Sequence, residues 1–179
     1  KNILLSRRFK NSYKNDINSK NIKAFKIAIK NITNFHRKQI PNNYKVNKKG
    51  VKTSLIWKPI NSVGLYVPGG NAIYPSSLLM NVIPAKVAGV KRIVVATPAK
   101  FNEINPYILA LLDELDIKEV YQIGGAHSIA ALAYGTESIK PVDKIFGPGN
   151  AYIASAKKQV FGKVGIDLIA GPSEIVVVA

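Results

Sequence analysis

Three short turns in the sequence combine glycine with proline, asparagine or histidine: residues 68–71 (PGGN), 124–128 (GGAHS) and 147–150 (GPGN). Glycine in a turn lets the backbone come close to a ligand and tolerates a positive φ. A helix that begins directly after such a turn offers free N–H groups to an anion such as a pyrophosphate. The GGAHS and GPGN turns fit this chemistry, although neither a G-x-G-x-x-G fingerprint nor a G-x-x-x-x-G-K-[ST] loop occurs.

Single polar residues in or near these turns are the candidate ligand contacts. Asn150 can donate and accept hydrogen bonds, and it either contacts a ligand or caps the helix that follows it. Tyr66 stands at a predicted strand end, where it either contacts a ligand or packs in the core. His127 is either a ligand contact or a solvent-facing loop residue. Ser173 and Glu174 follow a Gly-Pro turn, and they either face a polar or cationic substrate or only form a turn.

Strand and helix patterns alternate from residue 62 onward, with short links between them. The predicted strands are apolar throughout, which is typical of a parallel sheet that helices cover on both faces. The strands are predicted at residues 63–67, 92–96, 119–123, 144–146 and 175–178, and the helices at 76–88, 103–115, 128–134 and 151–160. Because ligands bind outside the carboxyl ends of such strands, the three turns are expected at one edge of the sheet. The predicted fold class is therefore α/β, an incomplete Rossmann-like sheet.

The first 60 residues are strongly basic. They carry 16 Lys and Arg residues and one acidic residue, Asp16, whereas residues 61–179 carry ten basic and nine acidic residues. Apolar side chains recur every three or four positions from residue 21 to residue 37, which predicts an amphipathic helix. We therefore divide the chain into a basic helical arm (1–60) and an α/β core (61–179). A basic arm can bind nucleic acid, but this one is poor in Arg, so we regard nucleic acid as the less favoured partner.

Composition excludes several other classes of protein. The sequence has no Cys, and its two His residues, His36 and His127, are far apart, so no disulfide framework or local metal-binding cluster is visible. No apolar run approaches the roughly 20 residues that a membrane helix needs, and no signal peptide is recognisable. We therefore expect a soluble, cytoplasmic protein without membrane contact.

The glycine turns together with their flanking sequence resemble the histidinol dehydrogenase family. The resemblance rests on GLYVPGGNAIYPSSLLMNVIPAKVAGV, on QIGGAHSIAALAYGTESI followed by VDKIFGPGNAYIASAKKQVFG, and on IDLIAGPSEIVVVA, in the order and near the spacing of that family. It covers residues 63–179 strongly and residues 1–20 weakly.

The resemblance implies an NAD-dependent oxidation of L-histidinol, through L-histidinaldehyde, to L-histidine in histidine biosynthesis. By position in the motifs, it implies that Tyr66, His127 and Asn150 contact NAD and that Ser173 contacts the substrate. The family usually has Gln at the position of His127, so that contact differs in reach and charge. The resemblance also implies a homodimer, and a zinc ion whose ligands, like the catalytic Glu–His pair, would follow Ala179.

These implications leave three hypotheses open. The chain is part of an NAD- and zinc-dependent dehydrogenase, in which case we expect residues 1–179 alone to show no turnover. Alternatively, it is a nucleic-acid-binding module that uses the basic arm, or the product of a decayed gene.

Overall fold

The computed structural model describes residues 4, 5, 13, 16–69, 73–100, 103–169, 176 and 177. Their centre is a five-stranded sheet in the order β5-β4-β3-β6-β7, and all neighbouring strands are parallel. The strands are β3 (Ser62–Tyr66), β4 (Arg92–Ala96), β5 (Glu119–Tyr121), β6 (Lys144–Phe146) and β7 (Gly165–Ile166). The predicted α/β class with a parallel sheet is confirmed.

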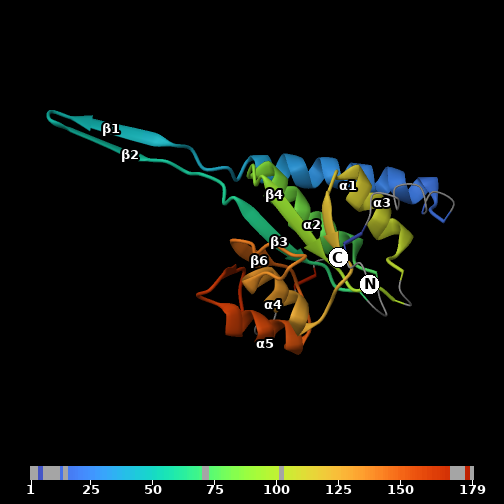
Figure 1. The fold of residues 1–179 in the computed structure, drawn as a ribbon. Helices are drawn as coiled ribbons and strands as arrows, with labels where there is room; N and C mark the ends of the chain where they lie inside the picture. Colours follow the sequence, from blue (N-terminus) through green and yellow to red (C-terminus); the bar gives the residue numbers. More distant parts are fainter. Residues whose placement is uncertain are drawn as a thin grey trace.

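Helices cover both faces of this sheet (Figure 1). On one face lie α1 (Ser19–Arg37), α2 (Pro75–Val87) and α3 (Pro106–Glu114), and on the other lie α4 (Ala126–Tyr134) and α5 (Ala151–Val160). The pleat of the strands explains this division, because successive side chains point to opposite faces. Leu65 and Val95 join the core under α2 and α3, whereas Tyr66 and Val94 join the core under α4 and α5.

Helix α1 belongs to the packed body rather than to a free arm. Asn18 caps it by accepting a hydrogen bond from the backbone N–H of Lys20 at 2.8 Å. Its apolar stripe packs on the core beneath α2 and α3, and Phe25 meets Tyr107 of α3 edge to face. The prediction of an amphipathic helix here is confirmed. The division of the chain at residue 60 stays a prediction.

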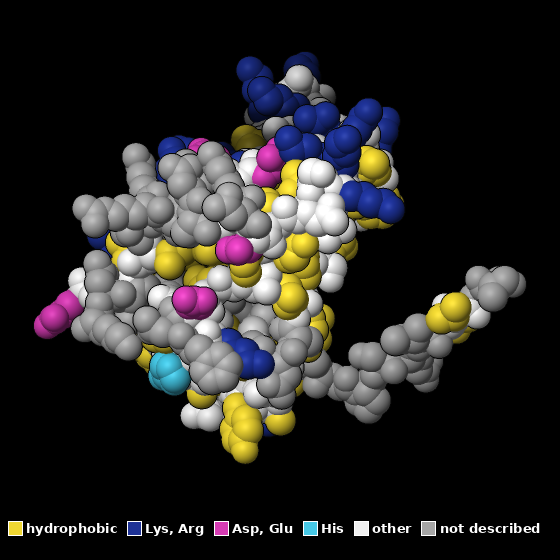
Figure 2. Space-filling view, turned by 90° about the vertical axis from the view of Figure 1, so that its right-hand side faces the viewer, with side chains coloured by type: hydrophobic (Ala, Val, Ile, Leu, Met, Phe, Trp, Pro, Cys, Tyr) yellow, Lys and Arg dark blue, Asp and Glu magenta, His cyan; other side chains and the backbone are white. Residues whose placement is uncertain are grey.

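The segment after α1 differs from the sequence prediction. Strands β1 (Tyr44–Lys48) and β2 (Val51–Leu55) pair antiparallel in a hairpin that the sequence analysis did not predict. Every residue of the hairpin is exposed, and it points away from both helical layers (Figure 1). Figure 2 shows Lys and Arg side chains gathered at the end of the molecule where α1 and this hairpin lie.

Other boundaries shift by a few residues. Helix α2 begins at Pro75, one residue before its predicted start, and no side chain caps it. The short strand β7 was not predicted. Of the strand predicted at residues 175–178, only Val176 and Val177 are described, and they lie outside the named strands and are 87% and 82% exposed.

None of the helices in the described ranges combines the length and apolar character needed to cross a membrane.

Candidate functional site

The order of the strands creates a topological switch point at the carboxyl end of the sheet. From the central strand β3 the chain runs outward through α2, β4, α3 and β5, and α4 then carries it back to β6 on the other side of β3. The loops that follow β3 and β6 therefore leave in opposite directions. Such a switch point is where open α/β sheets bind their ligands. The structure places Pro68 and Gly69, which begin the PGGN turn, on one side and the GPGN turn on the other.

The GPGN turn is pressed against the end of β3. Gly147 has φ +122°, a conformation that side chains rarely adopt, and a Cβ added there would lie 2.9 Å from the carbonyl carbon of Tyr66 and closer still to its oxygen. Only glycine fits this contact. The structure therefore brings together the backbone of Tyr66 and the turn that carries Asn150, two sites that the sequence separates by more than 80 residues.

Asn150 is the cap of α5. Its side-chain Oδ1 accepts a hydrogen bond from the backbone N–H of Ile153 at 3.1 Å, and the residue is exposed. This bond uses only the carbonyl half of the amide. Capping and ligand binding are therefore compatible, because the NH₂ group can still donate to a ligand at the start of the helix.

His127 is the second residue of α4 and is exposed. Gly125, the cap of α4, has φ +72°, and a Cβ built on it would lie 3.2 Å from Cε1 of the imidazole. The glycine thus makes room for the ring beside the helix start. The predicted helix after the GGAHS turn is confirmed, although it begins two residues earlier than expected, at Ala126.

Tyr66 and Ser173 are the two remaining predicted ligand contacts. Tyr66 is only 6% exposed and packs in the core under α4 and α5. Its backbone, rather than its ring, is therefore the part that meets the GPGN turn. Ser173 lies outside the described residues, as does Glu174.

The turn after β4 completes this edge, and sequence reasoning missed it. A Cβ on Gly69 would lie 2.8 Å from the carbonyl oxygen of Pro98, and a Cβ on Gly124 would lie 2.5 Å from the Cβ of the same proline. Pro98 therefore packs against both the PGGN and the GGAHS turns. Glycine marks the other ligand turns in the sequence, and the Thr97-Pro98 turn has none.

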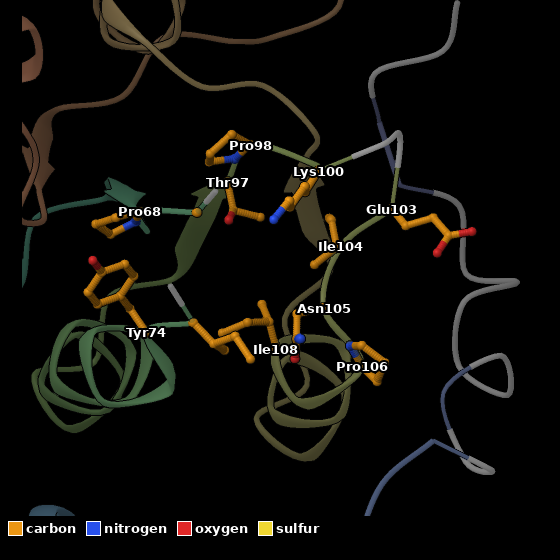
Figure 3. A pocket seen from close by; sticks show the side chains of 12 residues that line it. Pro68, Tyr74, Thr97, Pro98, Lys100, Glu103, Ile104, Asn105, Pro106 and Ile108 are labelled. Carbon is orange, nitrogen blue, oxygen red and sulfur yellow. The ribbon is translucent and has the colours of Figure 1, made fainter. Parts of the chain in front are cut away.

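A cavity of about 250 Å³ lies beside this proline, on the side of α2 and α3. Figure 3 shows Pro68 and Tyr74, from the segment between β3 and α2, on one side of the hollow. Thr97, Pro98 and Lys100 lie on another side, and Asn105 caps α3 at the rim. The carboxyl edge is thus open enough at β3 and β4 to admit a small ligand.

A family model of histidinol dehydrogenase matches residues 1–179. This chain belongs to the histidinol dehydrogenase family. It is 57% identical over 157 residues to histidinol dehydrogenase 1 of Nostoc sp., an alignment that covers 87% of this chain and 36% of that protein. It is 58% identical over 159 residues to the histidinol dehydrogenase of Listeria innocua, covering 88% of this chain and 37% of that protein.

The fold agrees with a solved member of the family. The crystal structure of histidinol dehydrogenase from Elizabethkingia anophelis superposes with a TM-score of 0.91 at 38% identity, covering 96% of this chain and 40% of that chain. The resemblance read from the glycine turns is therefore confirmed. These comparisons do not favour a nucleic-acid-binding module.

Histidinol dehydrogenases are oxidoreductases, and this chain spans between a third and two fifths of the length of the relatives it matches. Within the described ranges, no three His, Cys, Asp or Glu side chains come together in a group that could hold a metal ion.

Proposed function

We propose that this chain forms the NAD-binding part of an enzyme that oxidises L-histidinol, through L-histidinaldehyde, to L-histidine. Membership of the histidinol dehydrogenase family supports the reaction. The position of the GPGN turn at the switch point of a parallel sheet is the observation that carries the cofactor site. NAD, when bound, would accept a hydride in each of the two oxidation steps.

The residues at the carboxyl edge suit a dinucleotide. The start of α5 presents backbone N–H groups to a pyrophosphate, and the NH₂ group of Asn150 adds a donor at the same point. His127, at the exposed start of α4, offers its imidazole to the same ligand. Tyr66 contributes the strand end on which the turn is seated. Ser173 would contact the substrate.

Zinc does not fit the described residues, because they offer no group of three ligands. We therefore assign no step of the reaction in this chain to a metal. The zinc ligands and the catalytic Glu–His pair of the family would follow Ala179 in a longer protein. A homodimer in the cytoplasm is part of the same proposal.

The amide of Asn150 gives a direct test, because its two halves have different roles. Asn150→Asp keeps the oxygen that caps α5, and Asp is as good a cap as Asn, so the melting temperature should stay the same. The variant loses the NH₂ donor and places a negative charge beside a pyrophosphate. We expect the Kd for NAD, measured by calorimetry, to rise at least tenfold, or about 1.4 kcal/mol.

Asn18→Asp is the matched control. It makes the same change at the cap of α1, where Asn18 accepts from Lys20, and Asn18 belongs neither to the GPGN turn nor to the residues that line the cavity. Its affinity for NAD should equal that of the unmodified protein. If Asn150→Asp also leaves the affinity unchanged, Asn150 does not contact NAD. If the unmodified protein does not bind NAD, the proposed cofactor site is wrong.

A further inference from the structure

A buried lysine lies directly behind the GPGN turn. Lys157, on the sheet-facing side of α5, is 4% exposed, although lysine is almost never fully buried unless it is paired. Its Nζ lies 2.7 Å from Oδ1 of Asp167 and also donates a hydrogen bond to the carbonyl oxygen of Gly147. Nothing in the proposed chemistry requires a positive charge at this place. The role of Lys157 therefore needs a separate explanation.

Asp167 holds the other side of the same glycine. Its Oδ2 accepts a hydrogen bond from the backbone N–H of Gly147 at 3.0 Å. Its own backbone N–H donates to the carbonyl oxygen of Ile145 at 3.1 Å, which continues the pairing of β7 with β6. The N–H and C=O of Gly147 are therefore both bound by side chains, one from the residue after β7 and one from α5.

The third side of Gly147 is closed by the backbone of Tyr66. The peptide groups of this glycine thus cannot shift without breaking their hydrogen bonds to Lys157 and Asp167 or colliding with β3. Asn150 follows three residues later and begins the helix on which Lys157 itself lies. The hydrogen bond from Lys157 to Gly147 therefore connects α5 to the turn that leads into the start of the same helix. It fixes both the position and the direction of this turn.

We propose that Lys157 and Asp167 are positioning residues for NAD. Together with the Gly147 peptide they form a clasp, named here the Lys157 clasp, that sets where Asn150 and the start of α5 stand toward the cofactor. This inference rests on the proposed function, because it assumes that NAD binds at the GPGN turn. Neither side chain touches NAD in this account, and both act through Gly147.

The test is a double-mutant cycle on NAD affinity, measured by calorimetry in the full chain. The variants are Lys157→Met, Asn150→Asp and the two combined. Lys157→Met should raise the Kd for NAD at least tenfold. The clasp acts through the turn that carries Asn150, and the effects of residues in one network are not additive. The Kd of the combined variant for NAD should therefore exceed that of Asn150→Asp by less than about threefold. If Lys157 only stabilised the fold, the factors by which the two single substitutions raise the Kd for NAD would multiply in the combined variant.

Lys158→Met is the matched control, because it removes the same charge from the next residue of α5, which is exposed. It should leave the Kd for NAD unchanged. Asp167→Asn is the second variant. The amide places an oxygen at only one of the two positions that Oδ1 and Oδ2 hold, and its NH₂ group at the other, so it keeps one of their two hydrogen bonds. A smaller loss of affinity is therefore expected than for Lys157→Met.

A chemical rescue keeps the test decisive if Lys157→Met folds poorly. Because the sequence has no Cys, Lys157→Cys introduces a unique thiol. Alkylating this thiol with 2-bromoethylamine in urea, followed by refolding, restores an ammonium group of nearly the length of lysine. The modified protein should regain NAD affinity to within about threefold of the original, whereas the unmodified Lys157→Cys protein should not.

The outcomes separate the two proposals. If Asn150→Asp weakens NAD binding but a folded Lys157→Met protein binds NAD normally, the clasp is wrong and the cofactor site stands. Multiplicative effects, or a rescued protein without restored affinity, also overturn the clasp. If the original protein does not bind NAD, the proposed function fails and the clasp fails with it.

Discussion

Replacing Gly147 by alanine tests the contact on which the carboxyl edge is built. Gly147 has φ +122°, and an added Cβ would lie 2.9 Å from the carbonyl carbon and 3.1 Å from the amide nitrogen of Tyr66. These neighbours are backbone atoms of the central strand and cannot rotate away. The substitution therefore forces either the turn or the end of β3 to move.

The expected loss of stability has two parts. A non-glycine residue in such a backbone conformation costs about 1–3 kcal/mol. An extra carbon forced into a packed position costs about another 1–3 kcal/mol. We expect Gly147→Ala to lower the free energy of unfolding by about 4 kcal/mol, a large share of the 5–15 kcal/mol typical of a folded domain.

Gly162→Ala separates the two parts. Gly162 also has a positive φ, +95°, but nothing lies within 4 Å of a Cβ added there. It carries the backbone strain without the collision, and the loss of chain freedom in the unfolded state offsets some of that strain. A loss of about 1 kcal/mol is expected, so the two variants should differ by roughly 3 kcal/mol.

Urea unfolding followed by far-UV circular dichroism measures this difference. With an m value of about 2 kcal/mol per M, the midpoint for Gly147→Ala should fall about 1.5 M below that for Gly162→Ala. Equal midpoints for the two variants would refute the reasoning, because the contact with Tyr66 would then add nothing to backbone strain. NAD affinity should fall in Gly147→Ala alone, since only this variant displaces the turn before Asn150.

Two further predictions concern parts of the fold away from the carboxyl edge. Burial, together with its hydrogen bond to Asp113, raises the pKa of Tyr13 to about 12. Between pH 10 and 12 the unfolded chain therefore loses this proton before the folded protein does. Over this range the free energy of unfolding should fall by up to about 2 kcal/mol more in the original protein than in Tyr13→Phe, which thermal melts at each pH would measure. Arg92 forks onto Glu119 (2.9 Å from Nε to Oε1) and donates to the carbonyl oxygen of Pro141 at 2.8 Å. Arg92→Lys and Arg92→Met should both lower the free energy of urea unfolding by about 1 kcal/mol, because only the planar guanidinium reaches both partners. Full stability in Arg92→Lys would refute this.

The parts of the fold that sequence patterns predicted well are those with strong local signals. The strands at residues 92–96 and 144–146 and the helix at residues 151–160 have the predicted bounds, because apolar β-branched runs and an Asn cap mark them directly. The hairpin at residues 44–55 has weaker signals. Tyr44, Val46 and Thr53 alternate with Lys, Asn and Ser, and both faces are exposed, so no buried face produces a clear pattern.

The candidate site could be predicted in outline only. Glycine turns before helices located the edge, but no local pattern reveals that β6 returns to lie beside β3, which is what places Gly147 against Tyr66. Lys157 was hidden for a similar reason. It stands beside Lys158 in a helix whose other basic residue is exposed, and only the pairing with Asp167 explains why one lysine is buried.

The burial of Lys157 is better explained by position than by stability. Replacing both members of a largely buried ion pair with apolar side chains is often neutral or stabilising, so the pair of Lys157 with Asp167 is weak evidence for a role in stability. A methionine could not, however, donate to the carbonyl oxygen of Gly147 while Asp167 binds its N–H. Gly147 needs both bonds because its turn lies beyond the ladder of β6 and glycine itself imposes little conformational restraint. The same freedom that lets Gly147 approach Tyr66 thus creates the need for the Lys157 clasp. We therefore expect replacement of both Lys157 and Asp167 by apolar residues to affect NAD affinity more than stability.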